Sequence, residues 1–157
     1  MKLDTRVEQA LIEINFVERY ENISKKYNRE RTPKGQELDY YDGDFLMEIV
    51  ELLGYKAQYD KRERFFHIDL ESIEKFQFGF HFALEYGRLE LIWVAYEGDK
   101  VVLGSPWTRY PRLMIARDYI IKQPIVSDYV DFRDVMKIAF EMYEDFKQVF
   151  LKIAKDK

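Results

Sequence analysis

The chain has 157 residues, a formal net charge of −4 and no cysteine, and 17% of its residues are aromatic. This length and aromatic content predict one domain, residues 1–157, with a substantial core, and exclude a disordered chain. The negative charge disfavours nonspecific binding to nucleic acid, and the lack of cysteine excludes disulfides, zinc thiolate sites and cysteine nucleophiles.

The N-terminal stretch MKLDTRVEQALIEINF is too charged for a signal peptide, and no run of the sequence approaches the length of a transmembrane helix. Together with the absence of cysteine, these features predict a cytoplasmic protein that has no membrane partner.

An amphipathic helix is predicted from Thr5 to about Tyr27, because apolar residues recur there at helical spacing with charged residues between them. Asp4 or Thr5 is expected to cap its start. A loop that contains Pro33 and Gly35 follows the helix.

The segment from Gln36 to Tyr55 is acidic and contains no lysine or arginine. Its acids are Glu37, Asp39, Asp42, Asp44, Glu48 and Glu51, and they account for more than the whole net charge of the chain. The second half of the segment, FLMEIVELLG, predicts a short and substantially buried helix that is capped by Asp42 or Asp44 and ends at Gly54.

Two interpretations of this acidic segment remain open. Asp42-Gly43-Asp44 has the form of a metal-binding Asp-x-Asp, but it lacks the further ligands of a calcium loop, so helix capping is the first interpretation. Contact with another protein is the second, because tyrosines and carboxylates are common in contact surfaces. The residues of that candidate surface are Glu37, Asp39, Tyr40, Tyr41, Asp42 and Asp44.

A hairpin is predicted from Tyr55 to Leu70, with its turn near Asp60, and Glu71 to Lys75 connects it to a longer antiparallel meander from Phe76 to Gly104. The meander turns at Tyr86-Gly87 and at Gly98-Asp99. The second turn is expected to place Val101 beside Tyr96 and Leu103 beside Val94.

A two-residue turn at Tyr86-Gly87 gives the central hairpin two different faces. One face is apolar throughout and requires a cover; its residues are Phe78, Phe80, Phe82, Leu84, Leu89, Leu91, Trp93 and Ala95. The other face is mixed, with His81, Glu85, Arg88 and Glu90 toward the turn and Ile92, Val94 and Tyr96 beyond them. Glu85 and Glu90 extend the candidate contact surface onto this mixed face.

Two helices are predicted after the meander. A short one covers Tyr110 to Ala116, and a long one begins with Asp131 as its cap and carries an apolar stripe as far as Ile153. The stripe is expected to pack on the apolar face of the sheet. The fold class is therefore α+β, with a mostly antiparallel sheet, formed by a hairpin and a meander, packed by N-terminal helices and a long C-terminal helix.

Catalytic signals are sparse. His67 and His81 are the only histidines, both on predicted strands, and with Asp69, Glu85 or Glu90 they offer an alternative metal, ligand or acid–base site. No serine lies in a nucleophile elbow, and glycine-rich phosphate loops are absent. We therefore expect structural histidines, no enzymatic activity, no cofactor and no bound metal.

The run FHFALEYGRLELIWVAYEGDKVVLGSPW, followed by RLMIARDY and a helix that ends in MYEDFKQVFLK, resembles the small cytosolic immunity proteins of bacterial polymorphic toxin systems. The resemblance covers Phe76 to Lys152 and rests on the hairpin, the Gly-Ser-Pro step and the amphipathic helix. It implies a bacterial protein that binds and neutralises a cognate toxin, and it carries over no contact residue. The alternatives are a small enzyme or ligand-binding domain that uses His67 and His81, and an adaptor that self-associates; the oligomeric state is not predicted.

Overall fold

A six-stranded antiparallel sheet and five helices make up the computed structural model of the protein, which describes residues 2–156. The elements follow one another as α1 (Thr5–Glu13), α2 (Phe16–Lys26), α3 (Gly43–Leu52), β1 (Ala57–Asp60), β2 (Phe65–Ile68), β3 (Glu71–Ile73), β4 (Phe76–Glu85), β5 (Arg88–Glu97), β6 (Lys100–Leu103), α4 (Arg109–Met114) and α5 (Tyr129–Lys155). The strand order is β1-β2-β4-β5-β6, and β3 also pairs with β4. The predicted α+β class is confirmed.

The hairpin of β4 and β5 is the centre of the sheet, and its register is the predicted one. Phe80 lies opposite Trp93, and Glu85 lies opposite Arg88 across the turn. Both turn residues have positive φ, 52° at Tyr86 and 76° at Gly87, as in a type I′ turn, whose twist matches that of the flanking strands.

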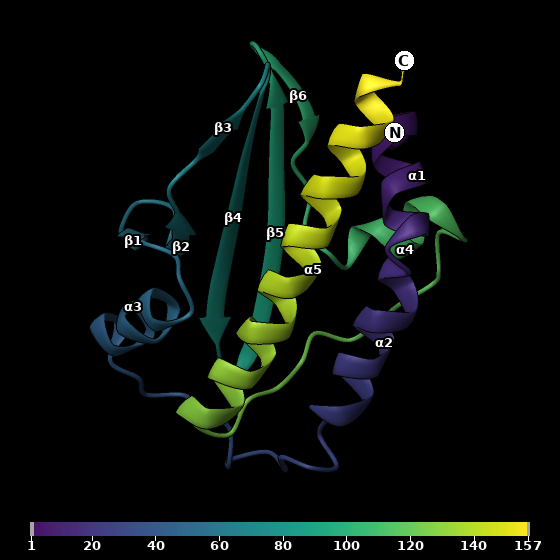
Figure 1. The fold of residues 1–157 in the computed structure, drawn as a ribbon. Coiled ribbons are helices and arrows are strands. Elements are labelled where there is room, and N and C mark those ends of the chain that lie inside the picture. Colours follow the sequence, from purple (N-terminus) through teal and green to yellow (C-terminus); the bar gives the residue numbers. More distant parts are fainter. Residues whose placement is uncertain (1, 157) are drawn as a thin grey trace.

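Helix α5 crosses the apolar face of β4 and β5 (Figure 1). The ring of Phe80 has no exposed surface, and its centroid lies 5.0 Å from that of Phe140 on α5 and 6.3 Å from that of Trp93. Phe82 meets Phe132 at 5.7 Å near the start of α5. Each such side chain contributes roughly 1.5–3 kcal/mol through burial, so this layer supplies much of the driving force for folding. The predicted packing of the stripe on the sheet is confirmed.

The N-terminal segment forms two helices rather than the single helix predicted from Thr5 to Tyr27. The break lies at Asn15, whose φ of 58° and ψ of 44° are left-handed, and asparagine tolerates this conformation better than most residues. The turn redirects the chain so that Phe16 is fully buried, with its ring 5.0 Å from that of Trp107. Asp4 caps α1, as predicted.

Two features of the sheet differ from the prediction. Strand β3 was expected to be only a connection, but Glu71, Ser72 and Ile73 pair with the first residues of β4. In β6 a register shift places Leu103 opposite Ala95 instead of Val94. The shift is a local irregularity in the ladder, and a pattern of alternating residues does not reveal it.

Two helix predictions also need correction. Asp128, not Asp131, caps α5, because its carboxylate accepts the backbone N–H of Asp131. Helix α3 is less buried than expected, since Phe45 is 41% and Leu52 is 89% exposed. Its cap at Asp42 is confirmed.

The segment between β6 and α5 returns along the turn end of β5. Trp107 donates its backbone N–H to the carbonyl of Leu91 at 2.8 Å, and Leu89 donates to the carbonyl of Pro124 at 3.0 Å. The long strands therefore have short neighbours on both sides, since β2 and β6 have four residues each and β3 has three. Within residues 2–156, no helix combines the length and hydropathy needed to cross a membrane.

Candidate functional site

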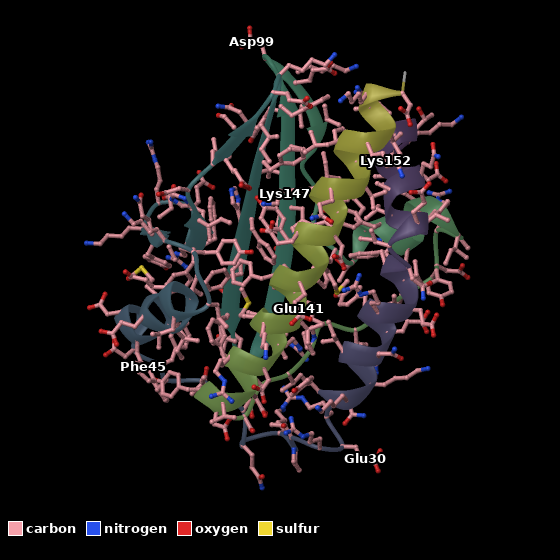
Figure 2. The ribbon with its side chains drawn as sticks, viewed as in Figure 1. Glu30, Phe45, Asp99, Glu141, Lys147 and Lys152 are labelled. Carbon is pink, nitrogen blue, oxygen red and sulfur yellow. The ribbon has the colours of Figure 1, made fainter. Side chains whose placement is uncertain are left out.

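The acidic segment forms an exposed surface at one corner of the molecule. The exposed residues of α3 recur at intervals that put them on one side of the helix. We call this side, together with the loop before it, the acidic surface; its residues are Asp39, Tyr40, Asp44, Phe45, Glu48, Glu51 and Leu52. Tyr40 is 95% exposed. Figure 2 shows Phe45 on α3, at the opposite end of the molecule from Asp99.

Three of its members are large apolar or aromatic side chains, which folding normally buries. Leu52 is the most exposed apolar side chain of α3, and the partly exposed ring of Phe45 packs against Tyr129 at a centroid distance of 4.6 Å. Exposed apolar groups surrounded by charges of one sign are typical of contact surfaces.

Two residues of the predicted contact set hold the loop instead of facing solvent. Glu37 accepts the backbone N–H of Gly35 at 2.6 Å and pairs with Arg29 at 3.4 Å. Backbone N–H groups and Arg29 hold the pKa of Glu37 below its ordinary value. Tyr41 donates its hydroxyl to the carbonyl of Leu84 at 2.8 Å, which fixes the loop to the end of β4. Both are positioning residues for the acidic surface.

An ion pair between the half-exposed Arg31 and the buried Asp131 holds the beginning of the same loop. The guanidinium of Arg31 donates two hydrogen bonds, of 3.0 and 2.9 Å, to Asp131 and lies 4.7 Å from the ring centroid of Tyr27. Asp131 also accepts the N–H of Ser127 at 3.0 Å and its hydroxyl at 2.7 Å. Burial raises the pKa of Asp131, but the hydrogen bonds from Ser127 and Arg31 outweigh burial and lower it. The pair ties the loop to the first turn of α5.

A pocket of about 400 Å³ opens between this loop and the sheet. We call it the aromatic pocket; it is lined by Tyr41, Asp42, Gly43, Asp44, Met47, Tyr59 and Phe66. The rings of Tyr59 and Phe66 are 4.7 Å apart, and Phe66 is almost fully buried whereas Tyr59 is 42% exposed. Burial raises the pKa of Tyr41, and the nearby Tyr59 and Glu85 raise it further. Glu85 lies next to Leu84, whose carbonyl binds Tyr41, and so is close to the acidic loop.

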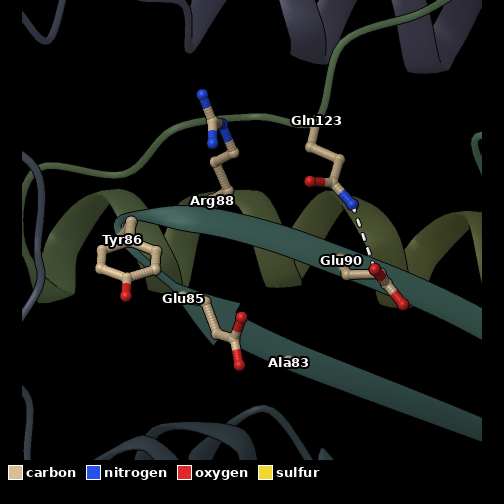
Figure 3. Close-up of a pocket in the computed structure, with 6 residues that line it drawn as sticks. All are labelled: Ala83, Glu85, Tyr86, Arg88, Glu90 and Gln123. Carbon is tan, nitrogen blue, oxygen red and sulfur yellow. Dashed lines mark hydrogen bonds between the residues drawn. The ribbon is translucent and has the colours of Figure 1, made fainter.

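Glu85 and Glu90 also line a smaller pocket of about 180 Å³ at the turn end of the hairpin (Figure 3). Glu85 is exposed, whereas Glu90 is half-buried and accepts a hydrogen bond of 3.3 Å from Gln123. Arg88, which lies between Glu85 and Glu90 in the sequence, extends from β5. Of the two carboxylates, only Glu85 is placed to extend the acidic surface.

The two histidines meet on the mixed face of the sheet. His67 and His81 are paired across β2 and β4, with ring centroids 5.9 Å apart, and His81 stacks on Phe65 at 4.6 Å. Burial lowers the pKa of His81, and His67 lowers it further, which favours a neutral imidazole. Within residues 2–156, no group of three or more His, Asp or Glu side chains is placed to hold a metal ion. The alternative site is therefore two imidazoles packed edge to face, to which the described residues add no third ligand.

One polar cluster was missed by the sequence prediction. Lys147 on α5 is buried and pairs with Glu71 and, at 2.9 Å, with Glu144, which also accepts the hydroxyl of Tyr55 at 2.6 Å. The sequence contained a signal for this cluster. Lys147 lies one turn after Tyr143 within the apolar stripe of α5, a position that predicts a buried side chain. Each charged group is already paired, so the cluster clamps α5 to the sheet.

The candidate site is thus the acidic surface with the aromatic pocket beside it, held by Glu37, Tyr41 and the Arg31–Asp131 pair. Comparison of the chain with protein-family models, curated proteins and solved structures finds no match.

Proposed function

We propose that the protein is a non-enzymatic binding protein that neutralises a basic protein partner through its acidic surface. This is the class of function that the resemblance to immunity proteins implies. The observation that carries the proposal is the combination, on one side of α3 and its preceding loop, of four carboxylates with the exposed side chains of Tyr40, Phe45 and Leu52.

Each part of the surface has a role in such a complex. The carboxylates attract a basic partner over a distance and orient it, which raises the association rate at low salt. The aromatic side chains of Tyr40 and Phe45 supply the contacts that exclude water once the partner is seated, and residues of this type dominate binding energies in interfaces.

The surface is also held in one conformation before binding. Glu37, Tyr41 and Arg31 fix the loop at three points, so little chain entropy remains to be lost when a partner binds. The mixed face of the sheet offers less support for a metal-dependent role, because His67 and His81 lie edge to face and no third ligand joins them within residues 2–156.

The proposal is tested by reversing the charge of the acidic surface while leaving unchanged the residues that hold the loop, Glu37, Tyr41 and Arg31. The variant Asp39→Lys/Asp44→Lys/Glu48→Lys keeps the cap at Asp42. The control Glu30→Lys/Asp99→Lys/Glu141→Lys makes the same change in net charge at three exposed acids away from the acidic surface (Figure 2). Proteins captured from the organism that encodes the chain are identified by mass spectrometry, and the association rate of the purified partner is then measured at several salt concentrations.

We expect a basic partner that binds the wild type and the control, associates more slowly as salt rises, and loses at least tenfold in association rate with the triple variant. Circular dichroism and thermal unfolding must show that both variants remain folded. A partner that binds all three proteins equally, with no dependence on salt, would refute the acidic surface as the recognition site.

A further inference from the structure

The aromatic pocket is built by residues from separate elements. Tyr41 comes from the loop, Tyr59 from β1 and Phe66 from β2, while Asp42 and Asp44 lie at its rim at the beginning of α3. Tyr41 and Tyr59 are partly exposed, so part of their ring surface remains accessible to a ligand. The hollow is therefore a feature of the folded sheet and not of the helix end alone.

Its chemistry favours one kind of occupant. Aromatic rings attract cations at their faces, and the attraction grows when the cation loses water. Carboxylates at the rim add opposite charge, and they exceed the partial positive charge of the α3 N-terminus, which Asp42 already caps with a hydrogen bond of 3.0 Å to the N–H of Asp44. An anion would meet the two carboxylates, and an apolar ligand would leave the carboxylate of Asp44 without a partner.

We propose that the aromatic pocket binds an arginine side chain of the protein partner, with the guanidinium against the rings of Tyr41 and Tyr59 and hydrogen-bonded to Asp44. This inference rests on the proposed function and names its anchor contact. Arginine fits better than lysine because its planar guanidinium stacks on aromatic rings and presents several donors to a carboxylate, whereas an ammonium is a compact, strongly hydrated charge.

Asp44 and Tyr59 are the residues to change. The side chain of Asp44 accepts no hydrogen bond within the described part of the chain, so Asp44→Asn removes charge without removing the cap. Tyr59→Leu removes an exposed ring and keeps an apolar side chain over Phe66. The matched controls are Asp39→Asn and Tyr40→Leu, which make the same changes in the adjoining loop, outside the pocket lining.

The probe is N-acetyl-arginine methylamide, and its neutral isostere, the citrulline analogue, is the reference ligand. Binding is followed by the backbone amide signals of ¹⁵N-labelled protein in NMR titrations. We expect the arginine probe to shift the signals of Gly43, Asp44 and Phe66 saturably and the citrulline analogue not to do so. Asp44→Asn and Tyr59→Leu should each weaken binding about two- to fivefold, while both controls bind as the wild type.

Equal shifts with citrulline, or undiminished binding to both pocket variants, would overturn the inference. The result is separable from that of the charge-reversal experiment. Loss of partner binding in the triple lysine variant without any arginine binding refutes the pocket and leaves the proposed function standing. Specific arginine binding together with a partner that ignores charge reversal, which includes Asp44→Lys, would show that the pocket accepts arginine but would refute both the proposed function and the partner's arginine as the occupant.

Discussion

Replacement of Asp131 by asparagine removes the buried charge that holds the beginning of the acidic loop. The carboxylate accepts hydrogen bonds from Arg31 and from the N–H and hydroxyl of Ser127, and the side chain is 5% exposed. Asparagine keeps one acceptor oxygen, but its amide group faces a donor. Hydrogen bonds to charged groups contribute about 1.5–3 kcal/mol each.

The expected loss is smaller than the sum of those bonds. Arg31 is 44% exposed and regains water when its partner is neutralised, so the loss stays below that for breaking a fully buried ion pair. We expect the free energy of unfolding to fall by about 2–3 kcal/mol and the melting temperature to fall by about 5–10 °C. The control is Asp134→Asn in the same helix turn, where the exposed pair with Arg133 contributes less than about 1 kcal/mol.

The same pair predicts a dependence on pH. The pKa of Asp131 is lower in the folded protein than the value of about 3.9 in an unfolded chain. Its contribution to stability is therefore complete above the unfolded-state pKa and is lost as the pH falls through the folded-state pKa. Urea denaturation should show a gap between Asp131→Asn and Asp134→Asn that is constant from pH 7 to about pH 5 and shrinks below about pH 4. Equal stability of the two variants at pH 7, or a gap unchanged at pH 2.5, would contradict the reasoning.

Two further variants test the core and the turn. Phe80→Ala should cost about 3–5 kcal/mol in urea denaturation, and Phe65→Ala on the half-exposed face should cost less than half of that; similar losses would mean that α5 does not cover one face selectively. Gly87→Ala should lower the melting temperature more than Gly98→Ala, although both glycines have positive φ, because the added methyl would lie 2.2 Å from the Cβ of Glu37 whereas nothing lies within 4 Å at Gly98. Indistinguishable melting temperatures would show that the contact with Glu37 is relaxed at no cost.

The parts of the fold that were predictable depend on local sequence. A two-residue turn between two alternating runs sets the register of β4 and β5, because a slip of one residue would turn every phenylalanine toward the wrong face. The stripe of α5 was equally clear, since its apolar residues keep one phase over many turns. Neither inference needed knowledge of a distant contact.

The wrong predictions, a single N-terminal helix and the absence of β3, arise where tertiary structure overrides the local sequence pattern. The apolar residues before and after Asn15 stay in helical phase, so periodicity does not show the break that buries Phe16. Strand β3 is too short to show alternation, and it forms because β4 extends beyond β2 and leaves its first residues free to pair.

For the candidate site, the sequence indicated the acidic segment, but it did not show which of its residues are exposed and which hold the loop in place. Asp39, Tyr40 and Asp44 are exposed as predicted. Glu37 and Tyr41 hold the loop instead. Glu37 binds Gly35 and Arg29 nearby in the sequence but also lies against Gly87, and Tyr41 binds the carbonyl of Leu84; Gly87 and Leu84 are more than 40 residues away in the chain. Such contacts depend on topology, which composition and spacing do not specify.

The position of the two ten-residue strands inside the sheet has a consequence for the behaviour of the protein at high concentration. A long strand with unpaired backbone groups is a template on which another molecule can add a strand, and phenylalanine-rich strands are especially prone to this. Here β4 and β5 are bordered by short strands and by the returning segment that holds Trp107 and Pro124. These two phenylalanine-rich strands are thus protected from intermolecular pairing for as long as those borders stay closed.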